Sequence, residues 1–189
     1  MKKGQNKMKG RRAVSSLKYL IFAGAMLLCS GCGNKEEVTS TTAAVTEKVT
    51  TEAEIGIDGK TQSYGNFTEV FIPADMKPEP GKLAGSDNPK ALWIQLKEND
   101  AHSYLLQLED EEICKSSIAY SKESNKDSKD VTFVAGGRTW TGVTYRYMDM
   151  MDCFQVYSMD GQTGILVSAS WYNAEDPRTM AILSGIKLK

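Results

Sequence analysis

The sequence predicts an α+β fold: a largely antiparallel β-sheet with helices packed on it. Two hairpin patterns support this prediction, because β-rich stretches flank Ala135-Gly136-Gly137 and again flank residues 160–163. Helix patterns occur at separate points, one from Glu109 onward and one after Asp176. Hairpins combined with isolated helices are typical of α+β proteins, whereas parallel α/β folds alternate strands and helices regularly.

The first third of the expected domain is marked by glycine and proline. Residues 55–60 contain two glycines and predict an edge strand or the segment that leads into one. Residues 64–73 are rich in β-forming side chains, and Pro73 ends that strand. Residues 74–90 contain three prolines and two glycines, so they predict a long surface loop. A further strand is expected at 91–96.

The middle of the chain predicts one helix after a segment of open assignment. Residues 103–108 could pair back onto the preceding strand or begin a helix. From Glu109 onward we expect a helix, because four consecutive acidic residues suit the positive end of a helix dipole. Residues 121–130 then predict a solvated loop. The residues expected near one face of this helix are Ile113, Ser117 and Tyr120.

The last third predicts two hairpins. The first pairs 131–134 with 138–148, and the second pairs 153–159 with 164–172. Alternation along the final long strand then assigns its side chains to two faces. The residues expected to share one of those faces are Ile165, Val167, Ala169 and Trp171.

A short helix and a closing strand complete the predicted domain. Asp176 is a suitable N-cap, and Pro177 suits the first helical turn because its missing N–H has no intrahelical partner there. Gly185 ends the helix, and residues 186–189 predict a short strand.

The first 31 residues predict a secretory signal peptide. Seven basic residues precede a short apolar run, and no acidic residue occurs before Glu36. The run is about ten residues long, well below the roughly 20 that a permanent membrane-spanning helix needs. It ends in Ser30 and Gly31, directly before Cys32, which matches the small-residue exit of such signals.

The exit sequence Ser30-Gly31-Cys32 resembles the lipobox of bacterial lipoproteins, in which the thiol receives a diacylglyceryl group and becomes the new N-terminus. Cys29 departs from that pattern, since leucine is usual three residues before the modified thiol. The resemblance implies acylation of Cys32 and attachment to the extracytoplasmic face of a bacterial cell membrane. Two or three acyl chains suffice for this, whereas a single chain gives only reversible binding. The alternatives are a plain cleaved signal and an uncleaved anchor.

The charge balance changes when the signal is removed. The whole chain of 189 residues carries 23 Lys and Arg and 24 Asp and Glu. Loss of the seven basic signal residues leaves 16 basic against 24 acidic side chains, a net charge of −8. A protein this acidic is a poor partner for nucleic acid. An anionic lipid surface would repel it as well, so attachment must come from the acyl chains.

The remaining chain predicts one tether and one domain. Residues 32–55 comprise the lipidated cysteine and a Thr- and Glu-rich stretch without aromatic residues, which cannot bury enough apolar surface to fold. A flexible coil of that length spans roughly 25–30 Å. Residues 56–189 are then expected to form a single globular domain.

The cysteines and the one histidine argue against catalysis. Cys114 and Cys153 could form a disulfide in an oxidising compartment, or they could be two buried thiols that never meet. His102 is the only histidine, so both a Cys-His-acid arrangement and a Ser-His-Asp triad would depend on that one residue. The cysteines and the histidine do not have the sequence spacing that a zinc site needs. We therefore expect no enzyme activity, no catalytic residues, no metal and no cofactor other than the lipid on Cys32.

Several apolar and turn patterns follow one another in a characteristic order. These are Phe-x-x-x-Phe-Ile-Pro at 67–73, Gly-Gly-Arg at 136–138, Gly-Gln-Thr-Gly-Ile-Leu-Val at 161–167, the Asp-Pro helix start, and Ile-Leu-Ser-Gly-Ile-Lys-Leu at 182–188. Together they resemble the PsbP-like fold over residues 64–189. That fold is shared by a photosystem extrinsic subunit, a Ran-binding nuclear import factor and many bacterial lipoproteins. The resemblance implies a sandwich that acts as a binding or assembly module without shared catalytic residues.

One strand suggests a recognition surface. Trp140 lies beside Arg138 and Arg146 on the strand that follows Gly137, and Trp and Arg are enriched at interface centres. These three residues are the candidate binding patch. The alternative is that both faces of the sheet are covered and that Trp140 belongs to the core.

The expected function is that of a membrane-anchored extracytoplasmic lipoprotein. It would act as a non-catalytic binding or assembly module for an envelope protein or peptide. The alternative is a solute- or polysaccharide-binding receptor that serves a transporter and uses aromatic residues beside the 74–90 segment. Neither hypothesis involves nucleic acid.

Overall fold

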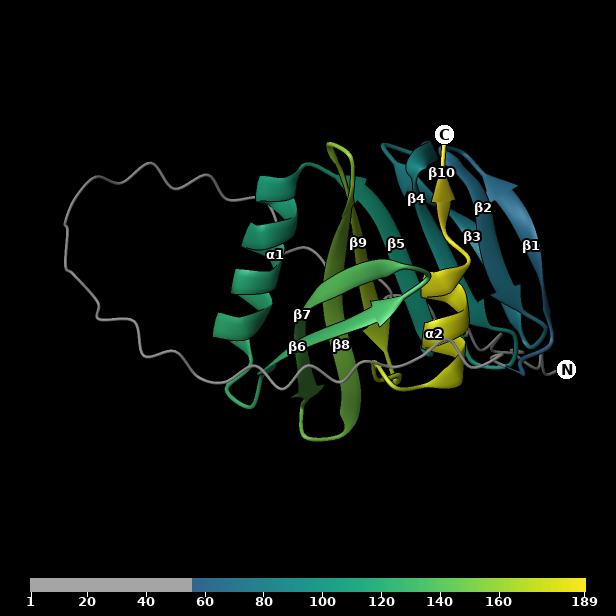
Figure 1. The fold of residues 1–189 in the computed structure, drawn as a ribbon. Helices are drawn as coiled ribbons and strands as arrows, with labels where there is room; N and C mark the ends of the chain where they lie inside the picture. The colour runs from purple at the N-terminus through teal and green to yellow at the C-terminus, as the bar shows by residue number, and fades with distance from the viewer. Residues whose placement is uncertain (1–55) are drawn as a thin grey trace, which may run out of the picture. The chain divides into compact units, whose positions relative to one another are not determined.

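A computed structural model describes residues 56–189; the predicted signal peptide, Cys32 and the tether lie outside them. Ten strands and two helices follow one another in this part of the chain (Figure 1). Neither of these helices is both long and apolar enough to span a bilayer. The elements are β1 Gly59–Tyr64, β2 Phe67–Pro73, β3 Met76–Leu83, β4 Ser86–Leu96, β5 Ser103–Glu109, α1 Glu111–Ser124, β6 Lys129–Ala135, β7 Arg138–Tyr147, β8 Met151–Asp160, β9 Thr163–Ser170, α2 Pro177–Ser184 and β10 Lys187–Leu188.

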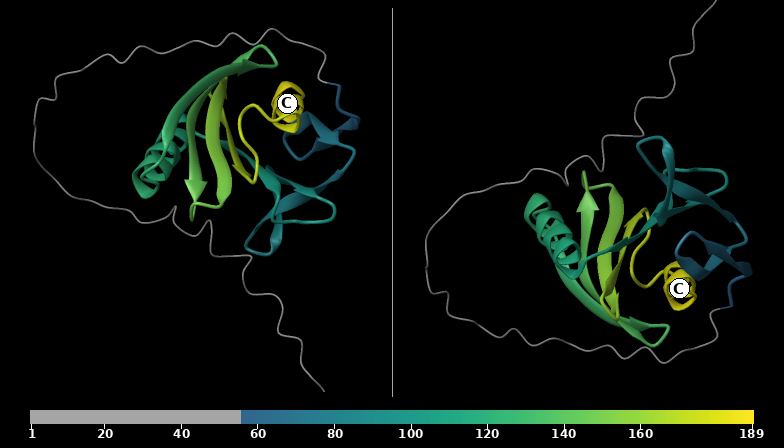
Figure 2. Two further views of the ribbon diagram at one scale, coloured as in Figure 1. Left: turned by 90° about the horizontal axis from the view of Figure 1, so that it is seen from below. Right: turned by 90° about the horizontal axis from the view of Figure 1, so that it is seen from above.

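The strands form two antiparallel sheets. Seven strands make the larger sheet in the order β3-β4-β5-β9-β8-β7-β6, and three make the smaller one in the order β1-β2-β10. Helix α1 covers one face of the larger sheet, against β7, β8 and β9, whereas α2 and the smaller sheet lie on the other face (Figure 2). This arrangement confirms the predicted α+β fold with a largely antiparallel sheet.

The hydrophobic core lies between the larger sheet and the layer formed by α2 and the smaller sheet. Register places side chains of neighbouring strands on the same inner face, as with Phe154 opposite Ala169 and Val156 opposite Val167. Each fully buried aliphatic or aromatic side chain contributes about 1.5–3 kcal/mol by its removal from water. The largest fully buried side chains are Trp140, Tyr104, Phe67, Phe154, Ile72, Leu92, Ile94, Leu106, Ile165, Ile182, Leu183 and Ile186.

The segment 74–90, expected as a surface loop, forms β3 and the first part of β4. It is a hairpin whose turn residues Ala84 and Gly85 have φ angles of 50° and 85°. The prolines Pro78 and Pro80 are tolerated because β3 is the edge strand of its sheet, so their missing N–H groups need not serve a neighbouring strand. The loop prediction was therefore wrong. Prolines are compatible with an edge strand, and whether a strand lies at the edge depends on the whole sheet and not on the local sequence.

Helix α1 presents a different face to the sheet than the one expected. Cys114 and Ser121 are buried, whereas Ile113 and Tyr120 are 45% and 55% exposed. The contact is partly polar: Ser121 Oγ donates to Gln155 Oε1 at 2.8 Å, and Gln155 Nε2 lies 2.9 Å from the hydroxyl of Ser168. Gly164 of β9 leaves room for the helix, since a Cβ atom on that residue would lie 2.5 Å from the Sγ of Cys114.

The turns and the last helix follow the local sequence. Gly136 and Gly137 have φ angles of 59° and 70°, the left-handed pair that a tight two-residue hairpin requires. Asp176 caps α2, because its Oδ1 accepts from the backbone N–H of Arg178 at 2.8 Å. The segment 103–108, left open by the sequence, is strand β5.

Candidate functional site

The candidate patch around Trp140 is not a surface. Trp140 is completely buried, and its Nε1 donates to the carbonyl oxygen of Ala135 at 3.2 Å. Arg138 is half-buried and serves the fold, since its Nη1 donates to Ile186 O at 2.7 Å and its Nη2 to Asp160 Oδ2 at 2.6 Å. Arg146 is exposed beside Asp152, 3.3 Å between Nε and Oδ1. The patch prediction was wrong because this face of β7 is the inner face of the sandwich.

The two thiols of the domain are free and buried. Cys114 packs against Gly164 at one end of β9, whereas Cys153 is paired with Ser170 at the other end. Six residues of strand, at about 3.3 Å each, put these ends roughly 20 Å apart. A disulfide needs Cα atoms within about 7 Å. The two cysteines are therefore buried thiols that do not meet, which is the second of the two alternatives given by the sequence. Burial raises the pKa of each thiol to about 11, which leaves both unreactive.

A ladder of four rings runs from solvent into the core at one end of the larger sheet. Trp171, 44% exposed, stacks on His102 with ring centroids 5.1 Å apart and planes 4° from parallel. His102 meets Tyr172 edge-on at 6.0 Å, and Tyr172 stacks on Tyr104 at 4.6 Å. The Tyr104 hydroxyl is hydrogen-bonded to Thr179 Oγ1 of α2 at 2.9 Å. These four residues are called the aromatic ladder below.

The backbone of Trp171 is unusual. Strand β9 ends at Ser170, and Trp171 follows with φ of 70°, in the left-handed region. Its N–H donates to Asp152 O at 2.7 Å, which fixes this conformation against β8. Alternation along the strand predicted that Trp171 shares a face with Ala169. That prediction was wrong, because the left-handed conformation of Trp171 ends the alternation. A bulky residue in the left-handed region costs about 1–3 kcal/mol.

An ion pair lies beside the ladder and joins two further segments to it. Arg178 of α2 donates from Nη2 and Nε to Asp75 Oδ2, at 2.6 and 3.1 Å. The guanidinium holds the pKa of the Asp75 carboxyl below its usual range. The pKa of the Tyr172 hydroxyl is raised by burial, so that ring stays neutral. The ladder is thus supported by α2 and by the β2–β3 turn.

The turns at this end of the molecule are acidic and partly apolar. Four connections meet here, at 74–75, 97–102, 148–150 and 171–176, and together they hold six acidic residues and one lysine. Two of the six carboxylates, Asp75 and Asp176, lie within 4.0 Å of the Arg178 guanidinium. Within the β7–β8 turn, Met148 and Met150 are 68% and 67% exposed. An exposed tryptophan and two methionines surrounded by carboxylates form what we call the ladder end.

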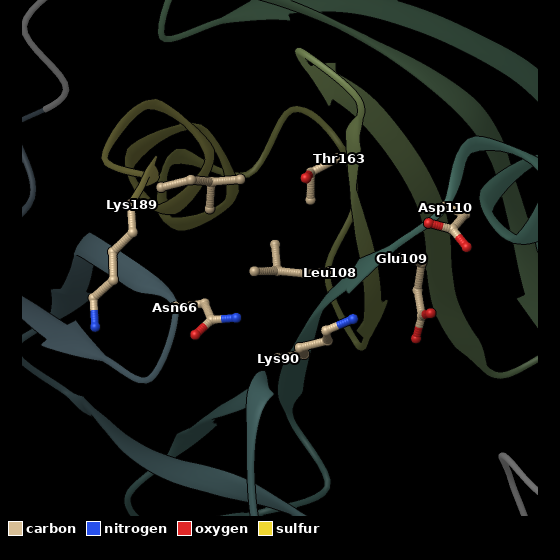
Figure 3. Close-up of a pocket in the computed structure, with 8 residues that line it drawn as sticks. Asn66, Lys90, Leu108, Glu109, Asp110, Thr163 and Lys189 are labelled. Carbon is tan, nitrogen blue, oxygen red and sulfur yellow. The ribbon is translucent and has the colours of Figure 1, made fainter.

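A shallow pocket lies at the opposite end of the sheet. Its volume is about 310 Å³. It forms where the pairing of β4 with β5 stops, at Ala91 opposite Gln107, while β5 continues against β9 as far as Glu109 opposite Gly164. Figure 3 shows its lining residues, which are Asn66, Lys90, Leu108, Glu109, Asp110, Thr163, Leu188 and Lys189.

The electrostatics of this pocket are mixed. Burial raises the pKa of the Glu109 carboxyl, and the nearby positive charge of Lys90 opposes that effect. Asp110 occupies the N-cap position of α1, yet its side chain makes no capping hydrogen bond. Over residues 56–189 there is no group of three or more His, Cys, Asp or Glu side chains placed to hold a metal ion.

Sequence reasoning missed both features for the same reason. Nothing local to Trp171 or His102 indicates that they stack, since they come from separate turns. The pocket likewise depends on where two strands part. The one available indication was the acidic run from Glu109, which the sequence explained by the helix start alone.

Two solved structures are weakly similar to this chain. No protein-family model and no curated protein matches the chain. A crystal structure of a protein from Bacteroides thetaiotaomicron VPI-5482 is similar with a TM-score of 0.44 and 11% identity, over 69% of this chain and 48% of that one. The chain therefore spans about half the length of that protein.

The solution structure of the PsbP protein CyanoP from Synechocystis sp. PCC 6803 is similar with a TM-score of 0.46 and 10% identity. The match covers 74% of this chain and 98% of that one. CyanoP belongs to the family that the sequence patterns resemble. Both likenesses concern the fold alone, and no residue role is transferred from either protein.

Proposed function

We propose that this protein is a non-catalytic binding module, held outside the cytoplasmic membrane by a lipid on Cys32. Its partner is an envelope protein or peptide that presents lysine or arginine beside apolar residues. The proposal rests on one observation: Trp171 is exposed, stacked on His102, and held in a left-handed conformation that folding alone would not favour.

The chemistry of the ladder end supports a partner of this kind. The free face of an indole attracts a lysine or arginine cation, with about 0.5–2 kcal/mol per contact. Carboxylates in the surrounding turns increase that attraction and repel acidic partners. Exposed Met148 and Met150 add adaptable apolar contacts, which are common at binding surfaces. A basic, partly apolar protein segment fits all three features.

The position of the ladder end suits a partner near the membrane. The carbonyl oxygen of Asp58 accepts from Ala74 N at 2.8 Å, so the start of the described chain lies beside the β2–β3 turn. Asp75 of that turn is bound to Arg178, next to the ladder. The expected tether therefore joins the domain at its binding end. The lipid surface itself is a poor ligand, because anionic headgroups repel the acidic turns.

The titratable groups support a binding role over a catalytic one. One face of the His102 ring is covered by Trp171, and its edge packs against Tyr172. Both thiols are buried with their pKa raised to about 11. The alternative hypothesis is a solute or polysaccharide receptor that uses aromatic residues beside residues 74–90, and such a receptor would place those rings around a pocket. The eight lining residues of the described pocket include no aromatic residue.

Site-specific photo-crosslinking tests where the partner sits. A photoreactive amino acid replaces Met150 in the anchored full-length protein, and in a control it replaces Tyr120 of α1, which is also exposed. We expect a discrete adduct from position 150 and none of the same mass from position 120. The yield should fall as salt rises from about 50 to 500 mM, because screening weakens charge attraction. Equal adducts from both positions would contradict the proposed surface.

A further inference from the structure

The pocket at the far end of the sheet exists because two strands separate. Residues 86–90 of β4, which precede Ala91, have no partner in β5, and in the same region β4 shifts its register against β3. The β1–β2 turn stabilises this departure, since Asn66 N donates to Pro89 O at 2.9 Å. The last residues of β5 therefore have β9 on one side and no β4 partner on the other. Leu108, only 5% exposed, forms an apolar floor there.

Charged groups of opposite sign stand around this floor. Lys90 comes from β4, and Glu109 and Asp110 come from the end of β5 and the start of α1. In Figure 3 the Lys90 ammonium extends toward the Glu109 side of the pocket, while Lys189 extends away on the far side of Asn66. None of these charged side chains makes an ion pair with any residue of the 56–189 region.

These groups differ in this respect from the arginines of the domain. All three arginines of residues 56–189 are bound to carboxylates, as in the Arg138–Asp160 and Arg178–Asp75 pairs. Glu109 is partly desolvated without a counter-ion in contact, which raises its pKa. An ammonium and two carboxylates left unpaired around an apolar floor offer opposite charges to a ligand that carries both.

We propose that this pocket binds a small zwitterion, a free amino acid or dipeptide with an apolar side chain. Its carboxylate lies at Lys90 and its ammonium group at Glu109 and Asp110. Its side chain packs on Leu108 and Leu188. Asn66 and Thr163 supply neutral hydrogen-bonding groups at the rim. The volume of about 310 Å³ is at the small end of ligand pockets and suits one or two residues. This site is independent of the ladder end and of the function proposed for it.

Calorimetry with four probes tests the assignment on the full-length protein in detergent. The probes are leucine and leucyl-leucine, which carry both charges, N-acetyl-leucine, which lacks the ammonium group, and leucinamide, which lacks the carboxylate. We expect at least one zwitterion to bind with a Kd below about 1 mM. Each blocked analogue of leucine should bind at least tenfold more weakly than the better zwitterion. No binding of either zwitterion at 10 mM, or equal binding of the blocked analogues, would overturn the proposal.

Matched variants distinguish the two charge contacts. Lys90→Gln should weaken binding of the zwitterion about tenfold. It should leave binding of leucinamide unaffected, since leucinamide has no carboxylate to contact Lys90. Glu109→Gln should weaken the zwitterion and leave N-acetyl-leucine unaffected. Lys126→Gln, in the exposed loop after α1, is the control and should change nothing. Equal effects of Lys90→Gln on leucinamide and on the zwitterion would contradict the assigned carboxylate contact. Loss of binding in the Lys126 control would do the same.

Discussion

The indole of Trp171 lies parallel to the imidazole of His102, with 5.1 Å between ring centroids. The two residues belong to turns that are 69 positions apart in the chain, and β5 and β9 bring them together by pairing Ser103 with Ser170. The stack is kept although Trp171 has φ of 70°. We take this cost as the signature of a residue retained for contact with a partner.

The backbone strain at Trp171 can be measured. Glycine adopts the left-handed region without penalty, whereas a side chain costs about 1–2 kcal/mol there. Trp171→Gly and Trp171→Ala both lose the stack on His102, so their difference isolates the backbone. We expect the glycine variant to be more stable by about 1 kcal/mol in urea unfolding. An alanine variant of equal or greater stability would show that the left-handed conformation is not strained.

The core position of Trp140 predicts a large loss of stability. Trp140→Ala removes a completely buried ring and its hydrogen bond to Ala135 O, which should cost about 3–5 kcal/mol. Tyr120→Ala, at an exposed position of α1, should change the free energy of unfolding by less than about 0.5 kcal/mol. Chemical denaturation of both variants checks this. Similar small effects at the two positions would be incompatible with Trp140 in the core.

The thiols should resist alkylation while the domain is folded. With the pKa of Cys114 and Cys153 raised to about 11, few thiolates form at pH 8, and burial hinders access to them. Iodoacetamide should therefore modify neither residue in the native protein. In denaturant it should modify both, with or without prior reduction. Peptide mass spectrometry gives the result, and modification that requires a reductant would reveal a disulfide.

The lipid on Cys32 is tested by a single substitution. Cys32→Ser removes the thiol that carries the acyl chains, so the protein should leave the membrane fraction and appear in the medium or periplasm. The wild-type N-terminal peptide should carry the mass of a diacylglyceryl group. Retention of the Cys32→Ser protein in membranes, together with an unmodified native peptide, would refute the anchor.

Elements that depend on neighbouring residues were predictable from the sequence. The Gly136-Gly137 turn needs only two residues that tolerate left-handed conformations, and the start of α2 needs only Asp176 and Pro177. Both were expected and both are present. Strand β5 and the inward face of α1 were harder to predict from the sequence, because their partners lie in distant parts of the chain.

The ladder end and the pocket could not be predicted because they are properties of the assembled sheet. Trp140 and Trp171 are both aromatic residues near turns, and only the packing of α2 and the smaller sheet buries one of them. The proline-rich segment 74–90 was expected as a loop because prolines disfavour a strand. An edge position permits Pro78 and Pro80 in a strand, but the local sequence does not show that position. The pocket also depends on the pairing of whole strands, since residues 86–88 of β4 pair with β3 and not with β5.

The central claim is that the ladder end holds the partner, and the dependence of the position-150 adduct on Trp171 tests it most directly. Crosslinking is repeated with Trp171→Ala, with Asp149→Asn, and with Tyr120→Ala as control. Asparagine is chosen because Asp149 has φ of 56°, a conformation that asparagine tolerates. We predict at least a tenfold loss of adduct for Trp171→Ala, a smaller loss for Asp149→Asn and no change for Tyr120→Ala. The same adduct at unchanged yield in Trp171→Ala would contradict the claim.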